Sequence, residues 1–277
     1  MEEHVLWITH LVNKLFGPMA AALLSKLHIK PNPDHPIPQH VAVGMLVVVL
    51  GALIALVLRA RLSVEKPGAL QQVAELLLTN PMGFGIKDLL EENVHHGAAK
   101  MIPFVGSISI FILLANLLGS FPNTFLIAPT GAVTVPLACA ILTFLYFNYH
   151  GFAHHGMGKY VLTFAGSPRS LGDWVLAILL FPVEIISTCA RLLSLTVRLW
   201  ANMYASDLIY VIFLGLLAGG ASAGYSKSPA LGFVLGIFPA TIPVLFIGLH
   251  IFVAVVQAYV FTVLPSVYLG LATADEH

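Results

Sequence analysis

Four ionisable side chains lie inside one strongly apolar stretch of this sequence. They are Glu184, Arg191, Arg198 and Asp207. Ionisable groups at membrane depth are costly and usually mark an ion path, a proton relay or a contact between helices. An arginine stays protonated in proteins, and Arg198 has no acidic residue one helical turn away. The pattern therefore predicts a permanent positive charge that is needed by a group outside its own helix.

Helical spacing gathers these groups into a polar stripe. At 100° per residue, Arg191 and Arg198 lie about 20° and about 40° from Glu184, on one face of a helix. Asp207, at about 140°, points to another side. The stripe consists of Glu184, Ser187, Arg191, Ser194, Arg198 and Asn202. For Arg191 two interpretations stay open: it pairs with Glu184 as a contact within the stripe, or it belongs to the ion path.

The last apolar stretch carries a second polar pair. His250 and Gln257 are seven residues apart, so they lie about 20° apart on one helix face. A lone histidine is usually a structural residue, but a His–Gln pair in an apolar helix is equally consistent with a proton relay. Both interpretations stay open for this pair.

The remaining histidines and the cysteines predict no cofactor. His150, His154 and His155 form one cluster and His95–His96 another, but no cysteine or carboxylate accompanies the cluster of three, as most zinc sites would require. We therefore expect no metal site. Cys139 and Cys189 both lie in apolar stretches, where we expect small unpaired side chains rather than a disulfide. No catalytic residue is predicted.

Composition indicates what must position these groups. Of the 277 residues, 58% are hydrophobic and only 9% are charged, with a mean hydropathy of +0.91. Roughly a quarter of a soluble domain is charged, so lipid must solvate most of this chain. The formal net charge is zero, which gives no reason to expect nucleic acid as a partner. The predicted fold class is an all-α polytopic membrane protein with a single membrane domain.

The apolar segments define its spans. A spanning helix needs about 20 apolar residues, which predicts three ordinary spans at 41–60, 101–119 and 132–149, after an extracytoplasmic or interfacial region at 1–38. The stretches at 173–218 and 231–271 are about twice the length of a span. Each is either a pair of short spans or one long tilted helix. We favour two long arms, because the clear polar turn is the one at 219–229.

Lys and Arg in the loops predict the orientation. They gather in the connections at 59–100 and 150–173 and are absent from 121–131, so the positive-inside rule makes the first two cytoplasmic. The N-terminus would then lie outside and the C-terminus in the cytoplasm. The first residues lack the basic region of a signal peptide, and we expect them to be retained. The expected location is a bacterial inner, or plasma, membrane.

Two segments resemble a known family. Residues 192–208, LLSLTVRLWANMYASDL, are similar to the signature of the a subunit of F-type ATP synthases, with its Ser-Leu, essential Arg-Leu, Asn-Met-Tyr-Ala and acidic residue. Residues 250–269, HIFVAVVQAYVFTVLPSVYL, resemble the last helix of that family. Weaker echoes are Asn116-Leu117-Leu118 and Pro182-Val183-Glu184. The likeness extends over about residues 41–271.

The resemblance implies a function. It makes the chain a stator subunit with two half-channels, beside a rotating ring of c subunits that each carry a membrane-embedded carboxylate. Arg198 would be the essential arginine that faces the ring, and Glu184 would line the cytoplasmic half-channel. The outer half-channel would be lined by Asn202, Asp207, His250 and Gln257. Implied partners are the c-subunit ring, the b-subunit stalk, the rest of the synthase and membrane lipid, and the expected ion is H+.

This sequence also departs from the family pattern. Many members have Gly-Glu where this chain has Ser206-Asp207, and Phe-Gly where it has Trp200-Ala201. Members often carry an acidic residue before the third span, but this chain has Gly131-Ala132-Val133-Thr134, and it has no Asp near Gly119. These differences leave open which groups line the outer half-channel.

Two other functions compete with this interpretation. In a proton-coupled secondary transporter, Arg198 would bind an anionic substrate and Asp207 or Glu184 would couple to protons. Repeats or paired broken helices would support a transporter, and the sequence contains no repeat. An intramembrane enzyme would use His250 and Asp207 as acid and base, but no G-x-S-x-G or HExxH motif is present.

Overall fold

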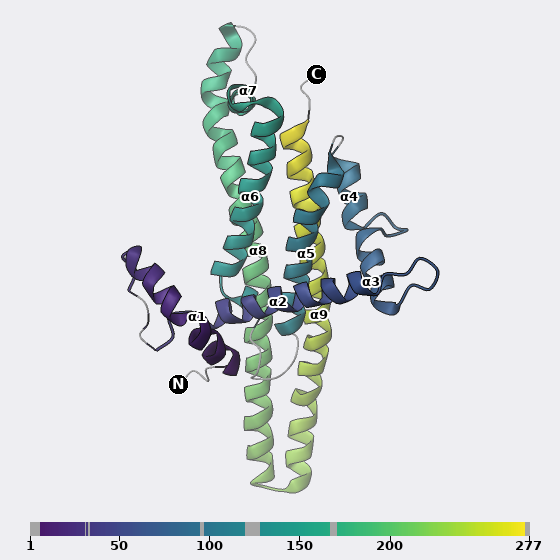
Figure 1. Ribbon diagram of the computed structural model, residues 1–277. Coiled ribbons are helices and arrows are strands. Elements are labelled where there is room, and N and C mark those ends of the chain that lie inside the picture. Colours follow the sequence, from purple (N-terminus) through teal and green to yellow (C-terminus); the bar gives the residue numbers. More distant parts are fainter. Residues whose placement is uncertain are drawn as a thin grey trace. The chain divides into compact units, whose positions relative to one another are not determined.

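The predicted helical membrane fold is confirmed. The structure, a computed structural model, describes residues 6–30, 32, 34–94, 97–119, 128–166 and 171–274. Five of the helices in this part of the chain are long and apolar enough to cross a membrane (Figure 1). Helices are expected here because lipid offers no hydrogen-bond partners, so a spanning segment must satisfy its own backbone. Residues 121–127 of the connection at 121–131, and the His95–His96 pair, lie outside the described residues.

The three ordinary spans are helices of similar length. They are α2 (Gln39–Ala60), α5 (Ala98–Gly119) and α6 (Thr134–His155). Helix α6 runs past the predicted end of the third span at residue 149. Asn148 does not end the helix: its side-chain Nδ2 donates to the Phe144 carbonyl oxygen, one turn back, at 2.7 Å. A 3-10 turn, η1 (Pro129–Gly131), lies just before α6.

Each of the two long apolar stretches forms one continuous helix. Helix α8 covers Leu171–Tyr225 and α9 covers Pro229–Thr273. Their 55 and 45 residues, at 1.5 Å per residue, give lengths of about 80 and 70 Å, more than twice the hydrocarbon thickness. Phe213 and Phe246 stack with their ring centroids 5.7 Å apart. The C-terminal half of α8 and the N-terminal half of α9 therefore run side by side (Figure 1).

The predicted turn at 219–229 is too long. Helix α8 continues to Tyr225, and only residues 226–228 connect it to α9. The hydroxyls of Ser222 and Ser226 donate to the carbonyl oxygens of Gly219 and Ala223, at 3.0 and 2.7 Å. Small residues with such local bonds let the helix extend beyond the apolar segment, and Pro229 then begins the next one.

The described chain divides into two compact units. The first contains residues 1–53, 111–135 and 199–256. Its N-terminal part is helix α1 (Trp7–Lys26), which packs Ile8 and Val12 with Val43 of α2. Asn13 binds the backbone at Ile37 to α1. Its Nδ2 donates to the Ile37 carbonyl oxygen at 3.0 Å, and its Oδ1 accepts from the Ile37 amide at 2.8 Å.

The second unit contains residues 54–110, 136–198 and 257–277. It includes three short helices, α3 (Ala69–Leu78), α4 (Ile86–Asn93) and α7 (Met157–Thr163). Its core is built from α4, α5, α6, α7 and the end of α9, with Leu90 and Leu269 fully buried. A buried hydrogen bond of 2.8 Å joins the hydroxyls of Ser109 and Thr262, which links α5 to α9.

The tightest backbone approach in this unit predicts a stability effect. A Cβ atom on Gly270 would overlap the carbonyl oxygen of Asn93 and lie 3.1 Å from its carbonyl carbon. A backbone carbonyl, unlike a side chain, cannot rotate out of the way of the added methyl group. We therefore expect Gly270→Ala to lower the free energy of unfolding by about 1–3 kcal/mol. The thermal stability of the detergent-purified protein measures this.

Gly248→Ala is the matched control for that substitution. It lies on the same helix, but a Cβ there meets no atom within 4 Å. We expect its melting temperature to be at or slightly above that of the parent, because alanine favours the helix by about 1 kcal/mol over glycine. Equal melting temperatures for the two variants would contradict the packing described at Gly270.

Candidate functional site

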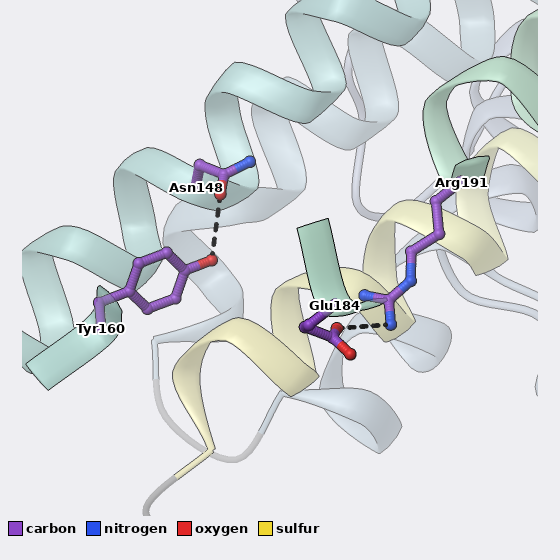
Figure 2. A network of polar contacts seen from close by, with 4 residues as sticks. All are labelled: Asn148, Tyr160, Glu184 and Arg191. Atoms are coloured by element: carbon purple, nitrogen blue, oxygen red, sulfur yellow. Dashed lines mark hydrogen bonds and ion pairs between the residues drawn. The ribbon is translucent and has the colours of Figure 1, made fainter. Parts of the chain in front are cut away.

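Glu184 and Arg191 form an ion pair on α8. The Arg191 Nη2 donates to Glu184 Oε1 at 3.3 Å, and the two side chains are 29% and 42% exposed, arginine first (Figure 2). Their spacing of two helical turns was one of the two arrangements that the sequence allowed for Arg191. The guanidinium carbon also lies 5.5 Å from the ring centroid of Tyr268 on α9. Arg191 is therefore held from two sides.

The ion pair opens into a cavity of about 230 Å³. Glu184, Thr188 and Arg191 supply its charged and polar wall from α8. The other walls are largely aromatic and come from α6, α7, the residues just after α7, and α9. Their aromatic members are Phe147, Tyr160, Phe164 and Tyr268. A carboxylate that borders such a cavity can exchange protons with water inside it.

Arg198 lies on an exposed face of α8. Its neighbours Leu195 and Leu199 are buried, with 2% and 0% of the residue exposed. The Arg198 Nη2 makes one long contact, 3.5 Å to the Ser194 hydroxyl. Among the described residues it forms no ion pair with a carboxylate. The charge predicted to need an external partner is thus presented at the surface of the chain.

Asp207 lies half-buried beside the turn that precedes α6. A Cβ atom added to Gly131 would lie 3.4 Å from Asp207 Oδ2. Because Gly131 has no side chain, the Asp207 carboxylate from α8 can lie close to the backbone of this turn. Asn202, also predicted to line an ion path, is exposed on α8. Ser187 is half-buried on the stripe.

Two polar residues near this turn were missed as candidate site residues. The Thr130 hydroxyl donates to Asn116 Oδ1 at 2.6 Å, and both residues are fully buried. His250 shares a hydrogen bond with the backbone of Asn116. The available signal was Asn116 itself, an amide in the largely apolar span 101–119. The first unit thus gathers Asn116, Thr130 and His250 at one place.

His250 and Gln257 are both buried on α9, at 7% and 3% exposure. Within the described chain, the His250 Nε2 and the Gln257 Oε1 atoms have no hydrogen-bond partner. Leaving a buried polar atom unpaired costs about 1–3 kcal/mol. A structural histidine would be expected to satisfy both nitrogens, so this arrangement favours the relay interpretation over the structural one.

The histidine cluster does not assemble into a metal site in the described residues. The rings of His154 and His155 lie 4.8 Å apart, and His150 packs against Tyr146 at 4.5 Å. No group of three His, Cys, Asp or Glu side chains that could hold a metal ion occurs in this part of the chain. Cys139 is buried and Cys189 is exposed, and both are free thiols.

Comparison with known proteins gives one consistent family. The family described as "ATP synthase A chain" matches residues 41–270. A protein of Koribacter versatilis named ATP synthase subunit a is 36% identical over 275 residues, which is 99% of both chains. A protein of the same name from Solibacter usitatus is 39% identical over 237 residues, covering 86% of this chain and 88% of its own.

A third relative shows the same likeness over a similar length. The ATP synthase subunit a of Desulfosudis oleivorans is 36% identical over 231 residues, covering 83% of this chain and 86% of its own. The match includes the α8 segment with Arg198 and nearly all of α9. From these matches, and from the five long apolar helices, we conclude that this chain belongs to the ATP synthase A chain family.

Proposed function

We propose that this chain is the a subunit of an ATP synthase and carries protons through its membrane sector. The observation that carries the proposal is Arg198, a permanent charge on the exposed face of α8 without a carboxylate partner among the described residues. A charged side chain at membrane depth is costly unless it is paired. Arg198 therefore needs an anionic partner on another chain. The carboxylates of a c-subunit ring are that partner.

Arg198 would act on the ring by electrostatics. A guanidinium within a few ångströms of a carboxylate favours the ionised form and lowers its pKa by about 1–3 units. A protonated ring site that reaches Arg198 would therefore release its proton. The same fixed charge would repel a proton that tried to cross directly between the half-channels. Lysine would serve less well, because burial can deprotonate it.

The outer half-channel would use the polar groups beside η1 and on α9. Its residues would be Asn202, Asp207, His250 and Gln257, joined by Asn116 and Thr130. The Nε2 of His250 and the Oε1 of Gln257 support this role, since neither atom has a hydrogen-bond partner among the described residues and leaving a buried polar atom unpaired is costly. Aspartate and histidine can both change protonation near neutral pH when their surroundings shift them, which favours H+ as the transported ion.

The cytoplasmic half-channel would contain Glu184. Its carboxylate borders the cavity of about 230 Å³, and the ion pair with Arg191 at 3.3 Å orients it. Ser187 and Ser194 would continue the polar path towards Arg198 along the stripe. With the predicted orientation, the N-terminus lies outside the bacterial inner membrane and the C-terminus in the cytoplasm.

The long helices would provide the surface for the partners. Large apolar side chains are exposed along α8, among them Val175, Ile178 and Ile186. Lipid or the helices of the c-subunit ring would cover them, and the b-subunit stalk would hold the chain against the rotating ring. In this role the chain catalyses no reaction by itself. Hydrolysis and synthesis of ATP belong to other subunits of the synthase.

Inverted membrane vesicles from a strain that lacks this chain, with and without the gene restored on a plasmid, test the proposal. We expect ATP-driven acidification of the vesicle interior only when the chain is present, and no dependence on Na+. An assembly control measures the ring and the stalk in both membranes. Acidification that proceeds equally without the chain, with assembly unchanged, would contradict the proposal.

A further inference from the structure

The ring of Tyr160 is fixed firmly in the wall of the Glu184 cavity. Tyr160 lies on the short helix α7 and is only 5% exposed. Its ring packs edge-on against Phe152 and Phe164, with centroids 4.8 and 5.2 Å away. Gly151 on α6 makes the room, since a Cβ there would overlap the Tyr160 ring. These contacts hold the ring in one place whether or not it carries a hydroxyl.

The hydroxyl of Tyr160 has a partner of its own. It donates to Asn148 Oδ1 at 3.2 Å (Figure 2). The amide of Asn148 cannot turn freely, because its Nδ2 donates to the Phe144 carbonyl oxygen and leaves Oδ1 as the acceptor. Burial raises the pKa of Tyr160 above its ordinary value near 10, so the phenol keeps its proton at neutral pH.

This neutral polar pair lies across from the charged pair. Figure 2 shows Tyr160 and Asn148 on one side and Glu184 with Arg191 on the other. Both charges act on the phenol, in opposite directions. On the same wall, the Thr163 hydroxyl donates to the Tyr160 carbonyl oxygen at 2.7 Å. Phe147 and Phe164 are purely apolar, and the ring of Tyr268 faces Arg191.

We propose that Tyr160 is a positioning residue for proton transfer at Glu184: its hydroxyl, held by Asn148, keeps the facing wall polar and so keeps water beside the carboxylate. A buried water needs about 2–4 polar partners, and Glu184 already shares one oxygen with Arg191. Water that bonds to both walls can pass protons to and from the other oxygen. The inference rests on the proposed function, because it assigns this cavity to the half-channel that contains Glu184.

The test replaces the hydroxyl and keeps the ring. Tyr160→Phe is compared with Tyr149→Phe, the same change on an exposed tyrosine of α6 that does not line the cavity. Vesicles with the complete synthase give the initial rate of ATP-driven pumping. Loss of one hydrogen bond of 0.5–1.5 kcal/mol predicts a rate about 2- to 10-fold lower for Tyr160→Phe. The rate of Tyr149→Phe should equal that of the parent.

A second readout separates hydration from packing. Thr188, which lines the cavity, is changed to cysteine in a chain whose Cys139 and Cys189 are serine, and a charged thiol reagent is applied from the cytoplasmic side. If the hydroxyl retains water, Tyr160→Phe slows labelling of the new cysteine. If Tyr160 only fills space, loosened packing leaves labelling unchanged or makes it faster. Should Tyr160→Phe fail to assemble, Asn148→Ala removes the acceptor instead and should slow both rates.

The outcomes divide cleanly. Slower pumping together with slower labelling supports the role of the hydroxyl. A parental pumping rate, or labelling that is unchanged or faster, in an assembled Tyr160→Phe complex that pumps with ATP overturns the role of Tyr160 and leaves the proposed function standing. A parent complex that does not pump with ATP overturns the proposed function itself.

Discussion

Replacing Arg198 with glutamine or alanine is expected to abolish ATP-driven proton pumping while the synthase still assembles. Arg198 is exposed on α8, makes only a long 3.5 Å contact with Ser194 and pairs with no carboxylate in the described chain. Its removal therefore leaves no buried partner charge unpaired within the described subunit. The fold should tolerate the change, whereas the ring would lose the charge that makes its carboxylates release protons.

The neutral variants should also leak. Without a fixed positive charge, a proton could pass between the half-channels without turning the ring. The membrane field drives such a leak with about 2.3 kcal/mol per elementary charge per 100 mV. Passive proton permeability of the vesicles measures the leak, and a fluorescent pH indicator in the presence of ATP measures pumping.

Arg191→Gln is the matched comparison for the Arg198 substitution. It makes the same change seven residues earlier on the same helix, where the arginine pairs with Glu184 at 3.3 Å. We expect reduced but measurable pumping, because Glu184 keeps its cavity while losing its ion pair. If Arg198→Gln pumped as well as Arg191→Gln, Arg198 would be a structural charge like its neighbour.

Replacing Asp207 with asparagine should slow pumping by about tenfold or more. The change removes a carboxylate from the proposed outer half-channel and keeps its size, and general acid–base groups contribute about 10²–10⁴-fold to proton transfer. Asp207→Glu should keep most of the pumping. The longer side chain can extend over Gly131, where no side chain competes with it.

A double substitution tests that geometry. In Gly131→Ala the new Cβ would lie 3.4 Å from Asp207 Oδ2, an ordinary contact that aspartate tolerates. With glutamate at position 207 the same methyl group should crowd the carboxylate. If the two substitutions acted independently, the relative pumping rate of the double variant would equal the product of the two single relative rates. We expect a lower rate than that product, because residues in contact usually couple. Strictly independent effects would contradict the placement of Asp207 beside Gly131.

Spacing along single helices made much of the fold and site predictable. The stripe from Glu184 to Asn202 follows from helix geometry alone, and so did the possible pairing of Glu184 with Arg191, which the structure confirms. Composition likewise predicted the helical membrane fold. The sequence favoured one long helix at 173–218 without excluding two short spans, because an apolar stretch of twice the span length is compatible with either.

The missed residues are those whose partners lie on other elements. Asn116 meets Thr130 across the segment between α5 and η1, and Tyr160 meets Asn148 across the turn between α6 and α7. No periodic pattern connects such pairs, since each depends on how the chain folds back. Gly151 is a similar case, because its lack of a side chain has meaning only where the Tyr160 ring packs over it.

Disulfide cross-linking to the ring is the most direct test of the claim that Arg198 faces it. In a chain whose Cys139 and Cys189 are serine, single cysteines replace Ser194 or Asn202, which flank Arg198 on the exposed face, or the buried Thr196 as control. The c subunit carries a cysteine one helical turn from its carboxylate, and a disulfide requires Cα atoms within about 7 Å. We predict oxidation to an a–c product from positions 194 and 202 and none from 196. Absence of the product at both exposed positions, in a complex that pumps protons, would contradict the account.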